Sequence, residues 1–183
     1  MPSCLLLEKT QPHHLMSTST HPTVSKLTSL YDLLVSISNH LQSPFILAVR
    51  LVWGIELLQA GWGKLTNIDT PTQYFTQLGI PFPHENAYLV GCTETFGGLF
   101  MALGLLSRLT ALPLIFNFIV AYATTEKDAL VALTKLNPDP FAAAAPFLFL
   151  LMAVLVLAFG PGAYSLDYII ARVRNLEWRG PRL

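Results

Sequence analysis

The sequence predicts an all-α membrane protein built as a bundle of four transmembrane helices. The 183-residue chain is 52% hydrophobic and 12% charged, with a mean hydropathy of +0.50. This is roughly half the charged share of an average soluble domain. Four apolar stretches follow one another after residue 43, with lengths that suit helices crossing a hydrocarbon core. The 11 basic and 11 acidic residues cancel, which excludes a nucleic-acid binder held by net positive charge.

The residues before the first apolar stretch have a different composition, and we expect two segments in them. Residues 1–24 are rich in Ser, Thr, His and Pro and are expected to form a mobile polar tail, in which Met16 is an alternative start to Met1. In residues 25–43 apolar side chains recur every three or four positions. This spacing predicts either an interfacial amphipathic helix or a helical extension of the first span.

The membrane domain is expected over residues 44–170, followed by a basic cytoplasmic tail over residues 171–183. Its four expected spans are residues 45–65, 87–106, 109–123 and 141–159. Pro44 is expected at the start of the first span, where its missing N–H is not needed. Pro113 and Pro146 lie near the starts of the third and fourth spans, so we expect no kink from them.

The segments between the spans predict the topology. Residues 66–86 and 125–140 carry Pro, Gly and Asp turn signals and are read as loops, whereas only two residues join the second and third spans into a tight hairpin. Four crossings put both termini on one side of the membrane. That side carries six basic residues against three on the other, which predicts cytoplasmic termini.

Charged and polar side chains inside the apolar stretches are the candidate site residues. An ionised group at mid-bilayer costs about 3 kcal/mol on insertion scales, so such a group faces the interior of a bundle and pairs there. Glu94 in the second span and Glu56 in the first are the candidate catalytic residues, as proton-accepting or ligand-binding groups in one buried pocket. Arg50 is the expected counter-charge. Structurally, Arg50 can instead snorkel from near the helix end while a carboxylate pairs with it to hold the bundle.

Three further polar residues are binding candidates: Gln59, Lys64 and Asn117. Gln59 shares one face of the first span with Glu56. Lys64, beside two glycines at the end of that span, can attract an anionic ligand or lipid headgroup, or it can simply mark the membrane interface. Asn117 can bind a ligand or join two helices by a hydrogen bond.

The sequence shows no motif for a metal or a resident cofactor. All five histidines lie outside the four stretches, so the sequence offers no pair of haem ligands there. It contains no Gly-rich dinucleotide loop and no phosphate-binding loop, and Cys4 and Cys92 form no metal-binding cluster. We therefore expect neither a metal site nor an electron-carrying cofactor held by this chain.

The motifs of the apolar region resemble those of the DoxX family of small four-helix membrane proteins. Residues 50–54 (RLVWG) and 59–65 (QAGWGKL) are similar to the Arg, Gly and Gly-x-x-Lys-Leu run of its first helix. Glu94 falls where the second helix of the family carries its glutamate. Residues 104–108 (GLLSR) resemble the family's hairpin turn, and residues 160–167 (GPGAYSLD) match its closing motif. In that motif we expect Asp167 to cap a short interfacial helix.

The resemblance implies a multi-pass protein of the bacterial inner membrane. It also implies that the protein works with a membrane or soluble partner protein in redox or quinone-linked chemistry, such as thiosulfate oxidation or protection against oxidative stress. A quinone is the ligand it suggests. The chain would then be at most a subunit of a membrane oxidoreductase that carries no cofactor of its own. Two alternatives stay open: a non-catalytic scaffold that recruits a partner enzyme, and a small-solute or proton pathway. The pathway would need a homo-oligomer, because four short helices leave little room for a lumen.

Overall fold

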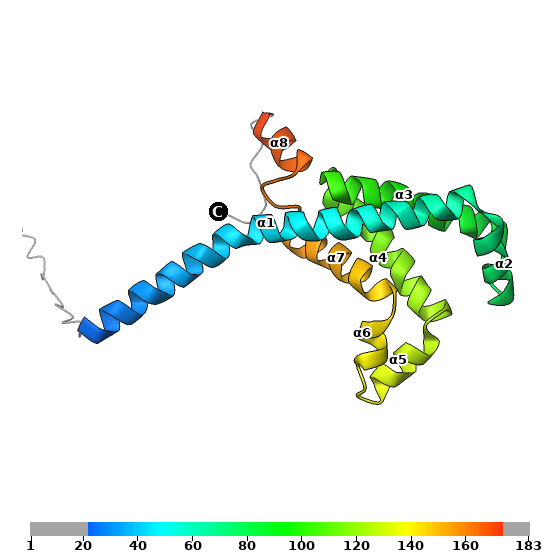
Figure 1. Ribbon diagram of the computed structural model, residues 1–183, viewed down its shortest axis with the longest axis horizontal. Coiled ribbons are helices and arrows are strands. Elements are labelled where there is room, and N and C mark those ends of the chain that lie inside the picture. Colours follow the sequence, from blue (N-terminus) through cyan, green and yellow to red (C-terminus); the bar gives the residue numbers. More distant parts are fainter. Residues whose placement is uncertain (1–21, 174–183) are drawn as a thin grey trace, which may run out of the picture. The chain divides into compact units, whose positions relative to one another are not determined.

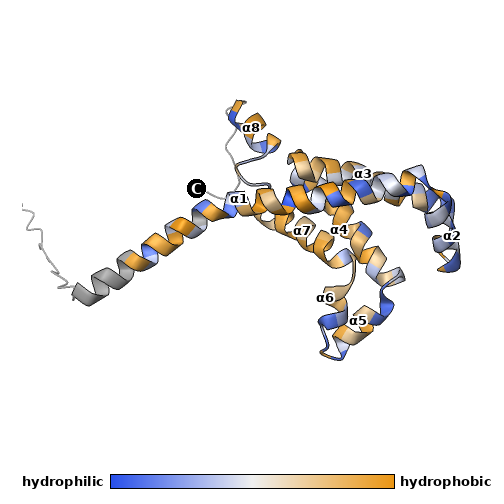
Figure 2. Cartoon of the chain, viewed as in Figure 1, coloured by the Kyte–Doolittle hydropathy of each residue, from blue (hydrophilic) through white to orange (hydrophobic). Residues whose placement is uncertain are grey.

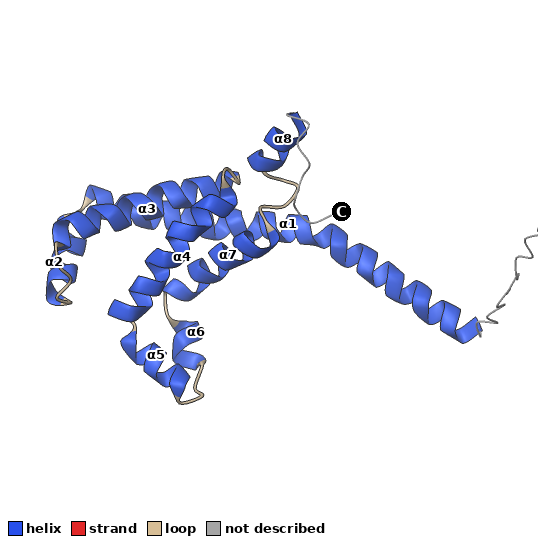
Figure 3. Ribbon diagram, turned by 180° about the vertical axis from the view of Figure 1, so that it is seen from behind, coloured by secondary structure: helices blue, strands red, loops and turns tan. Residues whose placement is uncertain are grey.

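The described part of this computed structural model, residues 22–173, is helical throughout its secondary structure and contains no strand (Figures 1 and 3). This confirms the all-α class. Its eight helices are α1 (Pro22–Thr66), α2 (Asp69–Gln77), α3 (Pro83–Leu103), α4 (Ser107–Thr124), α5 (Lys127–Thr134), α6 (Asp139–Ala143), α7 (Pro146–Phe159) and α8 (Leu166–Val173). The expected polar tail up to residue 21, with both possible starts, and residues 174–183 of the expected basic tail lie outside the described residues.

The chain divides into two units, residues 1–36 and 37–183. Of the first unit the structure describes residues 22–36, which are helical and belong to α1. The expected interfacial segment, residues 25–43, is therefore helical along its length. The second unit contains the rest of α1 and all the other helices, and it is the subject of the following paragraphs.

The core of the second unit lies where α1, α3, α4 and α7 meet. Leu57, Met101, Leu114 and Met152, one from each of these helices, are at most 1% exposed. On its outer face α4 exposes large apolar side chains, Leu109, Leu112, Phe116 and Ile119, and Figure 2 shows hydrophobic colour along most of α4 and α7. A helix that is apolar on both its buried and its exposed face is suited to a lipid surrounding.

Glycines allow α1 and α3 to run side by side at very short distance (Figure 1). A Cβ atom on Gly98 would lie 2.5 Å from the backbone nitrogen of Leu58 and 2.7 Å from the carbonyl oxygen of Gly54. These are backbone atoms, so no side-chain movement could make room for the methyl group. Close backbone approach at small residues is a usual way in which membrane helices associate.

Two described helices are long and apolar enough to cross a membrane: α1, over Leu30–Thr66, and α4, over Ser107–Thr124. α3 covers the second expected span but begins earlier and ends at Leu103, because Gly104 takes up a left-handed conformation (φ 69°). α7 is apolar but only 14 residues long.

The prolines behave differently from the prediction at two positions. The fourth apolar stretch is not one helix, because α6 ends at Ala143, Ala144 is extended (ψ 141°) and α7 begins at Pro146. Pro146 has no N–H for a helical hydrogen bond and its ring crowds the preceding turn, which favours the start of a new helix at this residue. The expected helix start at Pro44 is also wrong, since α1 continues through it. α4 likewise continues through Pro113.

Both expected loops contain a helix. α2 lies within residues 66–86, and α5 lies within residues 125–140. They are nine and eight residues long, and the turn-forming residues that flank them obscured their short amphipathic patterns. The short helix expected after the closing motif is present as α8.

Candidate functional site

Three helices each contribute one polar side chain to a cluster that is centred on a buried carboxylate. Glu94, on α3, is 6% exposed. One of its carboxylate oxygens pairs with the Nζ of Lys64 on α1, and the other accepts a hydrogen bond from the Nδ2 of Asn117 on α4 at 3.4 Å. We call Lys64, Glu94 and Asn117 the Glu94 cluster. Both oxygens of the carboxylate are therefore engaged, one by a charge and one by an amide.

Lys64 extends toward the middle of the helices and not toward their end. A Cβ atom on Gly61 would touch the backbone of Glu94 and Thr95, so Gly61 and Glu94 lie at the same level. Lys64 is three residues further on, about 4.5 Å along α1. Its side chain reaches back because helical side chains tilt toward the N-terminus of their helix. Lys64 therefore has a buried partner in the bundle, whereas the alternative interpretation gave it no role beyond marking the membrane interface.

The members of the cluster differ in exposure. The side chain of Lys64 is 33% exposed, whereas that of Glu94 is 8% exposed. The ammonium group can therefore meet a molecule that approaches from outside the bundle, and the carboxylate lies directly behind it.

Arg50 lies at a different place and is not the counter-charge of Glu94, so that expectation is wrong. Its side chain, 1% exposed, donates from Nε to the carbonyl oxygen of Met101 at 2.9 Å and from Nη2 to those of Ala102 (3.2 Å) and Tyr164 (3.3 Å). Nη1 donates to the carbonyl oxygen of Pro161. Two of these carbonyls belong to the last turn of α3, where the helix itself supplies too few donors. We call this arrangement the Arg50 junction.

Asp167 caps a helix, as expected, but the helix is α4 and not its own. Its carboxylate accepts hydrogen bonds from the backbone N–H groups of Leu106 (2.7 Å) and Ser107 (2.9 Å), at the start of α4. The cap of α8 is Ser165, whose Oγ accepts the N–H of Tyr168 at 3.2 Å. The closing motif thus holds the hairpin between α3 and α4.

Glu56 and Gln59 do not join the cluster either. Both side chains are exposed, and the expectation of one buried pocket holding Glu56 and Glu94 is wrong. Gly54 faces α3, and Glu56 follows it by two residues, which places it about 200° around the helix. The glycines that pack against α3 decide which face of α1 is buried. The polar residues alone did not indicate that face.

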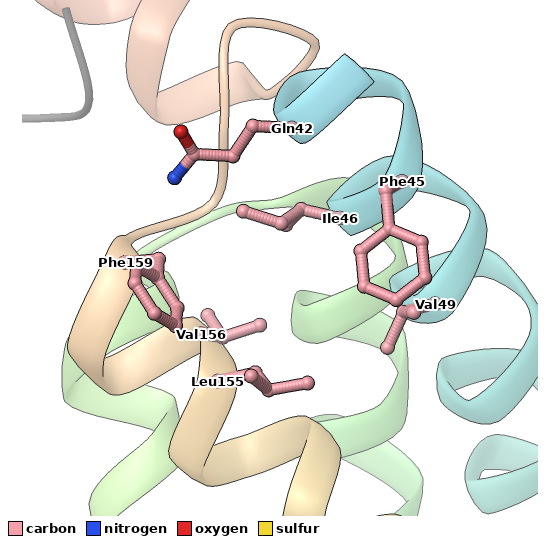
Figure 4. Close-up of a pocket in the computed structure, with 7 residues that line it drawn as sticks. All are labelled: Gln42, Phe45, Ile46, Val49, Leu155, Val156 and Phe159. Atoms are coloured by element: carbon pink, nitrogen blue, oxygen red, sulfur yellow. The ribbon is translucent and has the colours of Figure 1, made fainter. Parts of the chain in front are cut away.

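A separate apolar pocket of about 260 Å³ lies between α1 and α7 (Figure 4). Gln42 is the one polar residue that lines it, and the others are Phe45, Ile46, Val49, Leu155, Val156 and Phe159. Ile46 precedes Lys64 by 18 residues, about 27 Å along a helix. The pocket is therefore remote from the Glu94 cluster. In the described part of the chain, no three His, Cys, Asp or Glu side chains are grouped so that they could hold a metal ion.

Comparison with known proteins connects this arrangement with one family. A family model described as DoxX matches residues 45–127, which include Arg50, Lys64, Glu94 and Asn117. The uncharacterized membrane protein Rv3486 of Mycobacterium tuberculosis is 33% identical over 131 residues, which are 68% of this chain and 80% of that protein. The inner membrane protein YqjF of Escherichia coli is 31% identical over 147 residues, which are 75% of this chain and 98% of that protein. No solved structure matches the chain.

Proposed function

This chain belongs to the DoxX family of membrane proteins, and from that premise we propose that it is an inner-membrane subunit that binds a quinone-type ring at the Glu94 cluster. It would serve the redox chemistry of a partner protein, which would carry the electrons. The observation that supports this proposal is the buried carboxylate of Glu94 (6% exposed), held by an ammonium group and an amide from two other helices.

The proposed topology is a four-span bundle of α1, α3, α4 and the α6–α7 pair, with both termini in the cytoplasm. α3 has 21 residues, about 31 Å as a helix, which matches the hydrocarbon thickness. α7 alone has 14 residues, about 21 Å, so α6 would have to complete that crossing. The name of the E. coli relative, an inner membrane protein, supports the choice of membrane.

The groups of the cluster suit the chemistry of a quinone and its hydroquinone. The ammonium of Lys64 can donate a hydrogen bond to a ring carbonyl, while the carboxylate of Glu94 can accept a proton from a ring hydroxyl. The amide of Asn117 can serve either form because it has both donor and acceptor atoms. The ring itself is apolar, so it can reach the partly exposed Lys64 from the lipid.

The test is a binding titration of ubiquinone-1 with the full-length protein in lipid nanodiscs. Binding is followed by saturable quenching of tryptophan emission, because Trp62 lies two residues from Lys64. The Glu94→Gln variant should bind about 10- to 100-fold more weakly, which corresponds to losing one charge-assisted hydrogen bond of roughly 1.5–3 kcal/mol. The matched control is Glu85→Gln, which removes an exposed carboxylate from the first turn of the same helix and should bind as the wild type does.

A loss of folding is separated from a loss of binding by a thermal melt of each variant. The double variant Lys64→Gln, Glu94→Gln keeps the hydrogen-bonding shape without the charges, and it should fold but bind as weakly as Glu94→Gln. If Glu94→Gln folds and binds the quinone as tightly as the wild type, the cluster is a packing device. The non-catalytic scaffold would then be the better description of the protein.

A further inference from the structure

The face of α1 that points away from α3 carries a line of exposed residues with two polar groups at its centre. We call Val52, Glu56, Gln59 and Gly63 the outer stripe of α1. All four are exposed, Val52 to 51%, and a Cβ atom on Gly63 would meet nothing within 4 Å. The buried residues Gly54, Leu57 and Gly61 of the same helix lie on the opposite side.

In the proposed four-span topology, the outer stripe belongs to the part of α1 that would cross the hydrocarbon core, where polar groups are costly. Glu56 follows Arg50 by six residues and precedes Lys64 by eight, about 9 Å and 12 Å along the helix. It is thus level with the apolar contact between α1 and α3. Within residues 22–173, Glu56 has no hydrogen-bonding or ionic partner. A carboxylate there would face acyl chains, which is rare because it is expensive.

We propose that the outer stripe is the contact surface of a parallel homodimer in the membrane. A two-fold axis along the membrane normal places the same residues of both copies at the same depth. Gln59 lies one helical turn from Glu56, so the amide of Gln59 in one copy can donate to the carboxyl group of Glu56 in the other. The symmetry repeats the contact, and neither carboxyl group then faces lipid.

The spacing of the stripe fits a pair of helices. Its members follow one another by four, three and four residues, which is the repeat of a left-handed helix pair. Gly63 has no side chain, so the two backbones can approach closely at that end. Glu56 offers an acceptor and Gln59 offers an amide donor one turn away. A second copy of the chain presents the same two groups, so each donor can meet the acceptor of the other copy. This inference does not depend on ligand binding at the Glu94 cluster.

The first test is disulfide cross-linking in native membranes. The full-length chain with Cys4→Ser and Cys92→Ser receives one new cysteine at a time, Val52→Cys or Gly63→Cys, and copper phenanthroline is the oxidant. Both should give covalent dimers. The control is Leu51→Cys, because Leu51 is 41% exposed but lies about 100° around the helix from Val52. It should cross-link at least about tenfold less. Equal cross-linking at all three positions, or none at Val52→Cys and Gly63→Cys, would overturn the proposal.

The second test measures dimerisation of the purified chain in lipid bilayers by energy transfer between labelled copies at increasing protein-to-lipid ratios. Glu56→Leu and Gln59→Leu should each raise the dissociation constant about tenfold, because each removes both symmetric hydrogen bonds. Glu56→Gln keeps an acceptor and should have a smaller effect, and Ile55→Leu, beside the stripe, should have none. A wild-type chain that stays monomeric at all ratios would refute the homodimer. This is the result expected if a different protein covers this face. Dimerisation of Glu56→Leu at wild-type strength would refute it as well.

Discussion

Replacing Arg50 by Lys separates two roles for this residue, because the variant keeps the charge and loses the planar fork of donors. In the structure the guanidinium group donates to four carbonyl oxygens, two from the last turn of α3 and two from the closing motif. A lysine ammonium has three donors that diverge from a single atom. It cannot reach carbonyls on both sides of the junction at once.

The cost follows from the number of carbonyls that lose a donor. At least two of the four carbonyl oxygens should lose their donor, and each buried carbonyl without a donor costs about 1–3 kcal/mol. The carbonyl of Met101 also accepts the backbone N–H of Gly104 at 3.2 Å, so its loss lies at the low end of that range. We therefore expect Arg50→Lys to lower the free energy of unfolding by about 2–4 kcal/mol.

The assay is equilibrium unfolding by sodium dodecyl sulfate in mixed micelles, followed by far-ultraviolet circular dichroism. Arg172→Lys, at an exposed position on α8, should change the free energy of unfolding by less than about 0.5 kcal/mol. Folded Arg50→Lys protein should still bind ubiquinone-1, since Arg50 and Lys64 are about 21 Å apart along α1. An Arg50→Lys protein of wild-type stability would refute the structural role. If that protein also failed to bind the quinone, Arg50 would belong to the site.

The close contact of α1 and α3 and the cap of α4 give two more predictions in the same unfolding assay. Gly98→Ala should lower the free energy of unfolding by about 1–3 kcal/mol, because its methyl group would lie 2.5 Å from the backbone nitrogen of Leu58. Gly63→Ala, measured at a protein-to-detergent ratio low enough to keep the chain monomeric, should leave it unchanged or raise it, because that position is open within one chain. Equal effects of the two substitutions would contradict the packing argument. Asp167→Ala should lower it by about 1 kcal/mol and speed hydrogen exchange at the N–H of Leu106. Unaltered exchange would mean that Asp167 does not cap α4.

The two clusters divide the apolar region into a structural end and a candidate binding region. The Arg50 junction ties α1 to the α3–α4 hairpin and to the closing motif, mostly through backbone atoms. The Glu94 cluster uses side chains from three helices and leaves Lys64 partly exposed. Arg50 is 1% exposed, so its guanidinium group is shielded from a ligand, whereas the side chain of Lys64 is 33% exposed. The binding proposal therefore rests on Glu94 and Lys64.

The all-helical class and the position of Glu94 inside an apolar helix could be predicted from the sequence, because both depend on composition and local periodicity. The short helix after the closing motif was also predictable, but Asp167 was expected to cap that helix and instead caps α4, about 60 residues away. The start of α7 at Pro146 was missed even though its cause is local, because one helix was expected to extend over residues 141–159.

The partners of the charged residues were decided only by the tertiary structure. Glu94 pairs with a residue 30 positions away, and Arg50 bonds to carbonyls 51 and 111 positions away. Such pairs depend on how far each helix is rotated about its axis and where it is placed along its neighbour. Here Gly54, Gly61 and Gly98 set both quantities by allowing backbone contact between α1 and α3. That contact turns Lys64 toward Glu94 and Glu56 away from it, and a periodic pattern read along one helix does not contain this information.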